Sequence, residues 1–563
     1  MINSLKKWLK FFDRKSKLKF FFLISLILII NSMEVVGIGA LYPLIENLVD
    51  KPNSILNDIT LQYPFINIKT VIVALIIIYF LKFILSIYFF YKKNKLIYEI
   101  QKNITESFYI SKLKNEYKYF LKNNSSVIIN DILVEIDKAI GHLKSIIAFI
   151  ADSILLIFIC VTLFIINPYI TFSTLLIVVI IIIPMFKYLK RTNSKLGDER
   201  LFYDESITKL VKETFSVIKY IKVTFTENFF INIFSDYQVE KTKKYTQYST
   251  LLEIPRVGIE FLVISIFLIT LITLVIYKID INELLPIIGV FTLASFKLMP
   301  SINKLTNSYQ NIFFYEKSLK IIEHEYTDER KLISKTNNLE FKKNINFKNI
   351  SFRYSEGNQL LFSNQNFEIE KNKIIGIKGE SGSGKSTLID LFSGILTPTN
   401  GNIYVDGKNI SFDFYSKNLN VGYVSQQTYL IDDSIKNNIA FGIDEKKIDL
   451  NNLNDILKAS DISSFIKNKP NFLETIVGEN GVQLSGGQVQ RIGIARALYK
   501  KPDILILDEF TSSLDEETET KILKTIEKLK SNTTVIMSSH KNSTLKICDK
   551  LYSIVDGKII LSE

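Results

Sequence analysis

The sequence predicts a membrane domain of six transmembrane α-helices followed by a soluble α/β domain. The first 305 residues hold nearly all of the long apolar runs, and from Ile345 onward short β-like runs alternate with helical patterns, as in a soluble α/β domain. The chain has 563 residues, of which 47% are hydrophobic. This length is too great for a single domain, and a mean hydropathy of +0.18 is high for a soluble chain of this size.

Composition excludes several other classes of protein. A net charge of +12 combined with the high apolar content excludes a disordered chain, a collagen and an acidic tail protein. The two cysteines, Cys160 and Cys548, provide no disulfide framework and no paired-cysteine metal site. With three histidines in the chain, we also expect no histidine-rich metal cluster.

Residues 1–19 predict an amphipathic helix in the plane of the membrane surface. Leu5, Trp8, Leu9 and Phe12 fall on one helical face, with lysines opposite. Such a helix lies at the lipid interface with its apolar face buried, and Trp8 suits the depth of the lipid headgroups.

Six apolar runs are long enough to cross a hydrocarbon core, which requires about 17–25 helical residues. The first run is too long for a secretory signal peptide, contains Glu34 and is followed by five more runs. We place the spans within a transmembrane domain of residues 20–318, at residues 20–45, 70–90, 145–166, 169–186, 257–277 and 284–302.

The charges of the connecting segments orient these spans. Residues 1–19 carry seven Lys and Arg residues against one Asp, whereas residues 46–68 carry one basic residue, Lys51. Because basic segments stay on the cytoplasmic side, both termini and the long segments 91–144 and 187–256 are predicted to be cytoplasmic.

The two long cytoplasmic segments are charged, favour helix and contain few Gly or Pro residues. They predict that the spans continue as helices into the cytoplasm, turn near residues 123–126 and 213–224, and return. A helical arm of about 25 residues extends about 35–40 Å. The alternative is a flexible loop, which the helix-like patterning disfavours.

A polar connector, residues 319–340, leads to the soluble domain, residues 341–563. In that domain, residues 374–378 are predicted to form a buried strand, and residues 388–391 begin a helix. Between them lies the pattern G-x-x-x-x-G-K-S in the strand–loop–helix context that a phosphate-binding loop requires. The loop consists of Gly379, Glu380, Ser381, Gly382, Ser383, Gly384, Lys385, Ser386 and Thr387.

The residue types of this loop suit the binding of a nucleotide. Its glycines allow backbone N–H groups to surround phosphate groups, and the helix N-terminus adds its dipole. We expect Lys385 to reach the β- and γ-phosphates and Ser386 to bind Mg²⁺. Taken alone, the motif indicates a nucleotide-binding protein and nothing more specific.

Hydrolytic groups follow other predicted strands. The apolar strand of residues 504–507 ends at Asp508 and Glu509. We expect Asp508 to hold magnesium and Glu509 to polarise the attacking water. His540, after the strand of residues 535–537, is placed to sense the γ-phosphate.

Two further features complete the set. Gln426 follows the strand of residues 421–424 and can reach the metal or the water. A glycine-rich segment also opens a helix whose N-terminus can face a phosphate. That segment consists of Leu484, Ser485, Gly486, Gly487 and Gln488.

In this order, the motifs resemble those of an ABC-transporter nucleotide-binding domain over its whole length. The resemblance implies ATP and Mg²⁺ as cofactors, Tyr354 as the aromatic platform for adenine, and residues 475–481 as a segment like the exporter X-loop. Residues 513–515 match the D-loop. In this family, the segment at 484–488 is the signature, which lies far from its own phosphate loop and, with Asp515, completes the ATP site of a second copy.

Six spans and one nucleotide domain make the chain half of a transporter by this resemblance, which implies a homodimer with two hydrolytic ATP sites. The long arms and the surface helix resemble the type IV exporter architecture. In that architecture, closure of the nucleotide domains switches the membrane cavity from inward-open to outward-open. We therefore expect a multi-pass protein of the bacterial plasma (inner) membrane.

Charged residues within the spans give the first indication of a substrate. Each costs about 2.5–3.5 kcal/mol at mid-bilayer and so requires a reason. Lys297 and Lys304 share one helical face of the sixth span. With Lys82 and Arg256 they would form a ladder of basic residues running inward from the cytoplasm.

Pairing and snorkelling are the alternatives. Arg256 and Lys304 can reach lipid phosphates, and Glu260 lies one helical turn from Arg256. Lys82 and Lys297 lie too deep for easy snorkelling. Glu34 can serve equally as a polar group in helix packing or as a substrate contact.

Three short patches, residues 34–39, residues 255–260 and residues 296–303, resemble the lipid-linked oligosaccharide flippase of bacterial protein N-glycosylation. In that family, basic residues of the cavity engage a lipid-linked pyrophosphate, and an external helix takes part, which residues 54–62 could supply here. Lysine stands where arginine would suit bidentate contacts better.

The sequence thus favours an ATP-driven flippase that moves a polyprenyl-pyrophosphate-linked oligosaccharide to the outer leaflet. An exporter of peptides, hydrophobic drugs or lipids is the alternative. An ATP-gated channel or a regulator is disfavoured by the intact hydrolytic residues. We expect no nucleic-acid partner, because the basic residues are spread over juxtamembrane helices, where anionic membrane lipids explain them.

Overall fold

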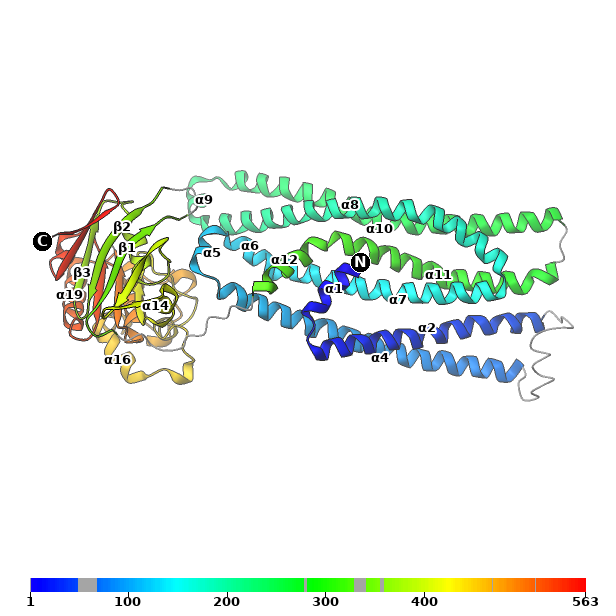
Figure 1. The fold of residues 1–563 in the computed structure, drawn as a ribbon, viewed down its shortest axis with the longest axis horizontal. Coiled ribbons are helices and arrows are strands. Elements are labelled where there is room, and N and C mark those ends of the chain that lie inside the picture. The colour runs from blue at the N-terminus through cyan, green and yellow to red at the C-terminus, as the bar shows by residue number, and fades with distance from the viewer. Residues whose placement is uncertain are drawn as a thin grey trace. The chain divides into compact units, whose positions relative to one another are not determined.

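The computed structural model describes residues 2–48, 68–277, 281–328, 341–354, 359–467, 469–511 and 513–562. It contains two compact units, shown in Figure 1, and each is considered by itself. The first comprises residues 1–115 and 119–331, and the second comprises residues 116–118 and 332–563. The sequence-predicted external helix at residues 54–62 lies outside the described residues.

The first unit is helical, with long helices joined by short ones. Its helices are α1 (Ile2–Phe11), α2 (Arg14–Leu48), α4 (Ile68–Leu113), α5 (Tyr117–Lys122, of which residues 117 and 118 belong to the second unit), α6 (Ser125–Asn130), the π-helix η1 (Asp131–Glu135), α7 (Ile136–Ile166), α8 (Pro168–Ser216), α9 (Ile218–Thr224), α10 (Glu227–Tyr277), α11 (Ile281–Phe314) and α12 (Glu316–Asp328).

Each of the six sequence-predicted spans lies within one of the long helices α2, α4, α7, α8, α10 and α11. Among the described residues, four helical segments are long and apolar enough to cross a membrane. They are Arg14–Asn47, Ile68–Leu113, Ser125–Ile166 and Pro168–Ser216. The expected helical arms are confirmed: α4, α8 and α10 run unbroken for 46, 49 and 51 residues.

Local sequence explains why the short connection between α7 and α8 is so tight. Asn167 ends α7 and begins α8, where its side chain accepts a hydrogen bond from the backbone N–H of Ile170 at 3.1 Å. Pro168 occupies the first position of α8, where its missing N–H costs nothing. One residue therefore reverses the chain.

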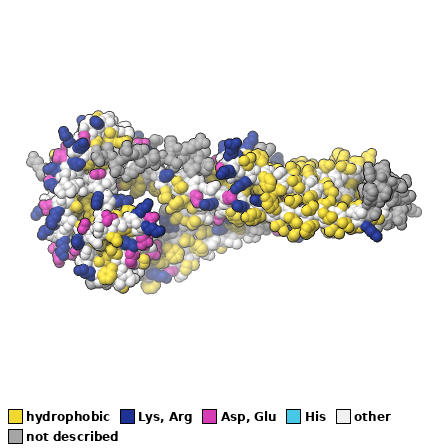
Figure 2. Space-filling view, turned by 90° about the horizontal axis from the view of Figure 1, so that it is seen from below, with side chains coloured by type: hydrophobic (Ala, Val, Ile, Leu, Met, Phe, Trp, Pro, Cys, Tyr) yellow, Lys and Arg dark blue, Asp and Glu magenta, His cyan; other side chains and the backbone are white. Residues whose placement is uncertain are grey.

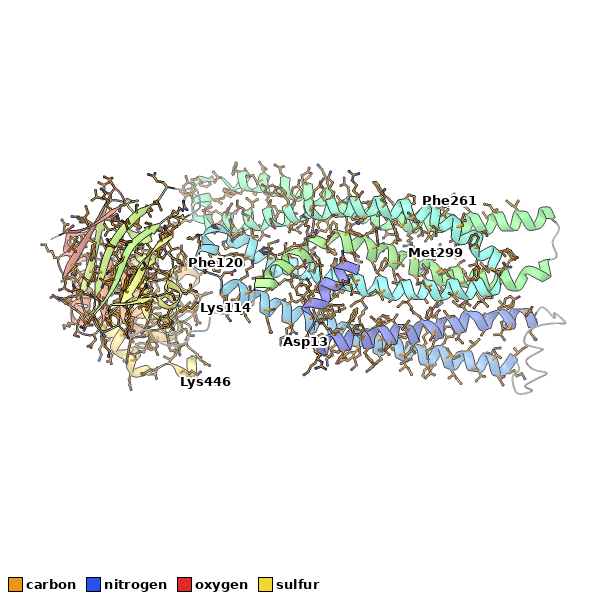
Figure 3. The ribbon with its side chains drawn as sticks, in the orientation of Figure 1. Asp13, Lys114, Phe120, Phe261, Met299 and Lys446 are labelled. Carbon is orange, nitrogen blue, oxygen red and sulfur yellow. The ribbon has the colours of Figure 1, made fainter. Side chains whose placement is uncertain are left out.

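The helices pack in pairs, with α2 beside α4, α8 beside α10, and α7 beside α11 (Figure 1). Large apolar side chains on their outer faces remain exposed, including Phe80, Ile183 and Phe261, the last labelled in Figure 3. Figure 2 shows these hydrophobic side chains gathered in a continuous belt, beside which Lys and Arg cluster. An exposed apolar surface of this extent is suited to lipid.

Trp8 is completely buried within the protein, whereas we expected its ring to face the lipid headgroups. Its indole N–H donates to Nδ1 of His142 at 3.0 Å, which satisfies the one polar atom of the ring. The helix α1 ends at Phe11, and Asp13 then accepts a hydrogen bond from the N–H of Ser16 at the start of α2. The amphipathic helix is thus shorter than residues 1–19.

The first part of the expected polar connector, residues 319–340, is helical. Residues 319–328 belong to α12, which places Leu319 and Ile322 in the same hydrophobic core as Trp8. Burial of these two side chains explains why helix continues beyond α11. The remaining connector residues, 329–340, lie outside the described part of the chain.

A buried charge cluster joins α8, η1 and α12. The Arg200 guanidinium donates two hydrogen bonds to the Glu135 carboxylate, at 2.6 and 3.2 Å, and one to the Ser318 hydroxyl at 2.9 Å. Asp204 lies at 3.3 Å. Arg200 and Glu135 are completely buried, so each charge depends on the other for compensation.

The second unit is an α/β domain with two sheets. Its strands are β1 (Asn344–Phe352), β2 (Phe362–Glu370), β3 (Ile374–Gly379), β4 (Asn400–Val405), β5 (Lys408–Ile410), β6 (Val421–Val424), β7 (Ile504–Asp508), β8 (Thr534–Ser538), β9 (Lys550–Val555) and β10 (Lys558–Ser562). Its helices are α13 (Lys385–Phe392), α14 (Phe412–Asn418), α15 (Ile435–Ile439), α16 (Leu450–Ala459), α17 (Ser463–Ile466), α18 (Gly486–Tyr499), α19 (Glu516–Leu529) and α20 (Asn542–Leu545).

The smaller sheet is antiparallel in the order β2-β1-β4-β5, and the larger has the order β10-β9-β3-β8-β7-β6. In the larger sheet β9, β3, β8, β7 and β6 are parallel, and β10 adds an antiparallel edge. Every residue of β7 and β8 is buried. Leu505 and Leu507 enter one hydrophobic core while Ile504 and Ile506 enter the other, as expected for a parallel sheet covered on both faces.

We predict that Glu135→Leu lowers the unfolding temperature of the full-length protein in detergent, because it leaves the buried Arg200 without its main partner. Removing one member of a buried pair costs about 3–5 kcal/mol. The measurement is thermal unfolding followed by tryptophan fluorescence or light scattering.

The matched control is Glu213→Leu, which removes an exposed pair with Lys209 on the same helix as Arg200 and costs at most about 1 kcal/mol. The double variant Glu135→Leu/Arg200→Met removes both buried charges and is expected to recover part of the loss. Equal unfolding temperatures for Glu135→Leu and Glu213→Leu would contradict the assignment.

Candidate functional site

The sequence-predicted hydrolytic residues converge at one edge of the larger sheet. Gly379 ends β3, Asp508 ends β7 and Ser538 ends β8, and Gln426 follows β6. Parallel strands bring their carboxyl ends to the same edge, which is where ligands bind in open α/β sheets. The parallel order β3-β8-β7-β6 therefore explains why residues distant in sequence meet here.

The loop between β3 and α13 has the conformation that phosphate binding requires. Gly382 and Gly384 have φ angles of +82° and +103°, which other residues adopt only with strain. The Ser383 hydroxyl is buried and has no hydrogen-bond partner among the described residues. The buried Lys385 ammonium donates to the carbonyls of Gly379 and Glu380, at 3.0 Å each. The orphaned hydroxyl and this lysine fit a phosphate group.

Glu509 is the centre of a hydrogen-bonded network. Its carboxylate accepts from the Gln426 amide at 2.7 Å and lies 2.9 Å from Nε2 of His540. The Lys385 ammonium lies 3.8 Å from Glu509 and 3.0 Å from His540. The structure thus unites residues that the sequence assigned to four separate motifs.

The backbone at Glu509 is strained. Its φ angle is +46°, a left-handed value that costs a residue with a side chain about 1–3 kcal/mol. The N–H of Glu509 donates to the Ser538 carbonyl at 3.2 Å and lies 3.1 Å from its hydroxyl. Ser538 therefore holds Glu509 in this conformation.

The oxygen atoms nearby suit Mg²⁺, which prefers oxygen ligands. The Asp508 carboxylate accepts hydrogen bonds from the hydroxyls of Ser386 and Ser538, the latter at 2.5 Å. Burial destabilises the ionised form of Asp508 and raises its pKa. A cation bound beside this carboxylate would stabilise the ionised form. Ser386, Asp508 and Gln426 are the residues that would hold the ion, which neutralises phosphate charge when bound.

Sequence reasoning missed two residues of this site, Ser538 and Asp390. Asp390 lies on α13, one helical turn after Ser386, a spacing that could have signalled it. Burial, and secondarily the neighbouring Asp508, raises its pKa to about 6. Ser538 could have been noticed as a hydroxyl ending a fully apolar strand just before His540.

Tyr354 and the glycine-rich segment also have defined places. The Tyr354 hydroxyl is hydrogen-bonded to that of Thr387 at 2.7 Å, and 41% of the residue is exposed, which leaves much of Tyr354 accessible. Ser485 is the N-cap of α18, and its side chain and that of Gln488 form a reciprocal capping box. Asp515 caps α19 by accepting from the N–H of Thr518 at 3.0 Å.

In the helical unit, two of the four basic residues predicted to line a substrate cavity share one acidic partner. Lys82 on α4 and Lys297 on α11 both pair with Glu34 on α2, and Lys297 lies 3.0 Å from it. Glu34 is 4% exposed. The pairing alternative is thus seen at these two positions, where Glu34 supplies the nearest opposite charge, and a role of the lysines in substrate binding stays a prediction.

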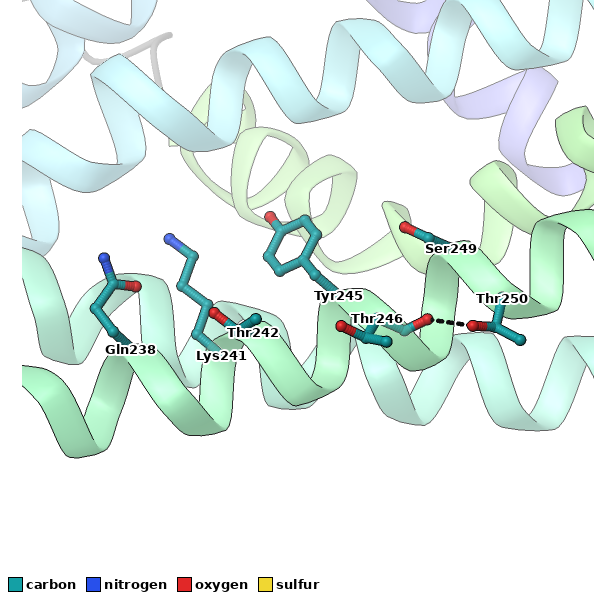
Figure 4. Close-up of a pocket in the computed structure, with 7 residues that line it drawn as sticks. All are labelled: Gln238, Lys241, Thr242, Tyr245, Thr246, Ser249 and Thr250. Atoms are coloured by element: carbon teal, nitrogen blue, oxygen red, sulfur yellow. Dashed lines mark hydrogen bonds between the residues drawn. The ribbon is translucent and has the colours of Figure 1, made fainter.

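The other two basic residues of the predicted cavity, Arg256 and Lys304, differ in their surroundings. Arg256 donates to Glu260 at 3.2 Å and lies 3.9 Å from Glu253, so the pairing alternative holds for it. Lys304 is exposed. A separate shallow groove of about 390 Å³ runs along one polar face of α10, and Figure 4 shows Lys241 and Tyr245 among the residues lining it. Lys241 is paired with Asp204 at 2.7 Å.

Comparison with known families agrees with both halves of the molecule. Residues 20–300 match the ABC transporter transmembrane region, and residues 362–512 match the ABC transporter ATPase domain. The chain belongs to the ABC transporters. It carries one transmembrane region and one ATPase domain, and it is a half-transporter of the exporter type, integral to the membrane and driven by ATP hydrolysis.

Relatives of the exporter include a putative export ATP-binding/permease protein of Rickettsia typhi, 29% identical over 100% of this chain and 95% of the relative. An ATP-dependent lipid A-core flippase of Vibrio vulnificus is 39% identical over 38% of this chain and 37% of its own length. The protein of the same name from Cupriavidus pinatubonensis is 27% identical over 78% of this chain and 75% of its own length.

Among solved structures, a bacterial Atm1-family ABC exporter with ATP bound has the same fold as this exporter. The TM-score is 0.78, with 20% identity over 97% of this chain and 95% of the other. This agreement confirms the predicted exporter fold, with a helical transmembrane region followed by a P-loop ATPase domain.

We predict that Glu509→Gln lowers the ATPase rate of the reconstituted exporter at least about 100-fold, because the amide cannot accept a proton from water. The measurement is phosphate release at saturating ATP. Glu516→Gln, a change to an exposed carboxylate shortly after Glu509, is the control and should stay within about twofold of wild type. A wild-type rate in Glu509→Gln would refute the assigned role.

We predict that the raised pKa of Asp390 makes the stability of the protein depend on pH. Because its folded pKa of about 6 lies above the value of 3.8 that is usual for an aspartate, the folded state retains the proton to higher pH, and stability is lost as pH rises from about 4 through 6. Asp390→Asn should raise the unfolding temperature at pH 7.5, and this gain should vanish near pH 4. Asp413→Asn, at an exposed aspartate on α14, should show no such trend.

Proposed function

We propose that this exporter flips a polyprenyl-pyrophosphate-linked oligosaccharide from the cytoplasmic to the outer leaflet of a bacterial inner membrane. The observation that carries the proposal is the cluster of Lys82, Lys297 and Glu34 on three helices of the transmembrane region. Relatives named as flippases of lipid A-core, also a glycolipid, support a lipid substrate.

Charge balance explains why this cluster suits an anionic lipid. Two ammonium groups face one carboxylate, so the cluster carries one uncompensated positive charge within a predicted span. Such a charge is costly in a low-dielectric region. A lipid-linked pyrophosphate supplies the missing negative charge and can displace Glu34 from the lysines, whereas a neutral drug cannot.

The ATPase residues supply the work. In the proposed homodimer, the signature segment at 484–488 and Asp515 of one copy complete the ATP site of the other, and both termini are cytoplasmic. Lys385 and His540, which now contact Glu509, would bind the γ-phosphate and leave Glu509 to orient water. Gln426 donates a hydrogen bond to Glu509, so it would couple the strand β6 to the rearrangement of Glu509. Closure of the two ATPase domains would then drive alternating access of the membrane cavity.

We predict that Lys82→Ala and Lys297→Ala each abolish the transport of a polyprenyl-pyrophosphate-linked sugar in proteoliposomes, because each removes a charge that the pyrophosphate requires. Lys102→Ala is the matched control, since Lys102 lies on the same helix as Lys82 and is 72% exposed. The measurement is the ATP-dependent rate at which the sugar becomes accessible on the opposite leaflet.

Glu34→Gln separates binding from packing. If the lysines bind the substrate, removal of the competing carboxylate lowers the lipid concentration for half-maximal ATPase stimulation by about 5–10-fold, a change of about 1–1.4 kcal/mol. If the cluster only holds the helices together, the same variant lowers the unfolding temperature without tightening binding. Control-like transport by both lysine variants would refute the proposal.

A further inference from the structure

A pocket with both apolar and polar lining residues lies between α10 and α11, apart from the Glu34 cluster. Its volume is about 450 Å³, which is within the range of pockets that bind small molecules. Arg256 and Glu260 contribute from α10, and Phe296, Asn303 and Asn307 contribute from α11. Figure 3 labels Met299, another lining residue, on α11.

Two acceptors of this pocket have no partner. The side-chain oxygens of Asn303 and Asn307 are buried and form no hydrogen bond with any described residue. The two residues are one helical turn apart on α11, so they share a face. An unpaired buried acceptor is destabilising, and a ligand with hydrogen-bond donors would satisfy it.

A third acceptor comes from the backbone. Pro300, also in the pocket wall, lies within α11 and has no N–H. The carbonyl of Phe296, whose helical donor would be residue 300, therefore lacks that bond. The pocket wall thus combines two side-chain oxygens without a partner among the described residues and a turn of α11 that lacks one backbone hydrogen bond.

The charged and apolar side chains of the pocket restrict the class of ligand that it could bind. The Arg256 guanidinium is held between Glu253 and Glu260, so its charge is compensated within the protein. Phe296 is 71% exposed and lines the same wall. A sugar ring has hydroxyl donors around its edge and C–H groups on its face, which suit the asparagine acceptors and the aromatic ring respectively.

We propose that this pocket is a carbohydrate subsite, in which Asn303 and Asn307 accept hydrogen bonds from the hydroxyl or acetamido N–H groups of the sugar nearest the lipid phosphate. The inference rests on the proposed function, since it assigns the glycan of the same substrate. It makes the exporter selective for glycosylated over bare carrier lipid.

The test measures ATPase stimulation of the reconstituted full-length exporter by two pairs of lipids. One pair is polyprenyl pyrophosphate with and without a single N-acetylhexosamine, and the other is a diacyl lipid phosphate with and without a hexosamine. The variants are Asn303→Leu and Asn307→Leu, which keep the size of the side chain and remove its polar atoms. Asn232→Leu, at an exposed asparagine of α10 outside the pocket, is the matched control.

The expected result is a rise of about 10-fold in the half-maximal concentration of the glycosylated lipid for each pocket variant, with no change for the bare lipid or in the control. Asn303→Asp, which keeps an acceptor, should retain more of the preference than Asn303→Leu. Equal effects on glycosylated and bare lipids, or no effect, would overturn the subsite.

The two lipid pairs separate this inference from the proposed function. If only the glycosylated diacyl lipid stimulates and the pocket variants weaken it, the subsite stands and the polyprenyl carrier is wrong. If both polyprenyl lipids stimulate equally, the carrier stands and the subsite is wrong. Failure of all four lipids to stimulate the wild-type exporter would refute both.

Discussion

The need to compensate every charge that is removed from water governs the functional regions of this exporter. An ion in a low-dielectric region is destabilised unless an opposite charge or several hydrogen bonds neutralise it. Glu34 meets this requirement in part for two lysines, Glu135 meets it for Arg200, and Ser538 supports the buried Asp508. Each cluster joins separate helices or strands, so the same compensation that makes burial tolerable also fixes tertiary packing.

Charge pairs within the protein also determine which contacts a ligand must replace when it binds. Glu509 is already bound by Gln426 and lies beside His540 and Lys385. A ligand phosphate can shift the conformation of this site only by replacing such contacts with stronger ones. The lysines at Glu34 are in the same situation with respect to an anionic lipid. Both regions therefore hold a resident partner that a ligand would displace. In the pocket between α10 and α11, by contrast, the side-chain oxygens of Asn303 and Asn307 have no hydrogen-bond partner among the described residues.

Much of the fold could be predicted because its signals are local. Apolar length predicted the spans, and glycine spacing predicted the loop after β3, since those patterns act within one element. Trp8 and α12 were misjudged because their neighbours decide their environment. Trp8 has the character of an interfacial residue, but an acceptor on α7 allows it to be buried. Residues 319–328 are polar on average, but two apolar side chains on one face are enough to dock a helix.

The sequence by itself determined which chemical groups this protein has and in which order they occur, because motif chemistry depends on residue type and short spacing. It therefore determined the class of ATPase and the membrane location of the first half. Only the tertiary structure decided which charges meet. Glu34, Lys82 and Lys297 lie far apart along the chain, and their pairing follows from the packing of three helices. Long-range packing is a property of the whole chain, and no local pattern encodes it.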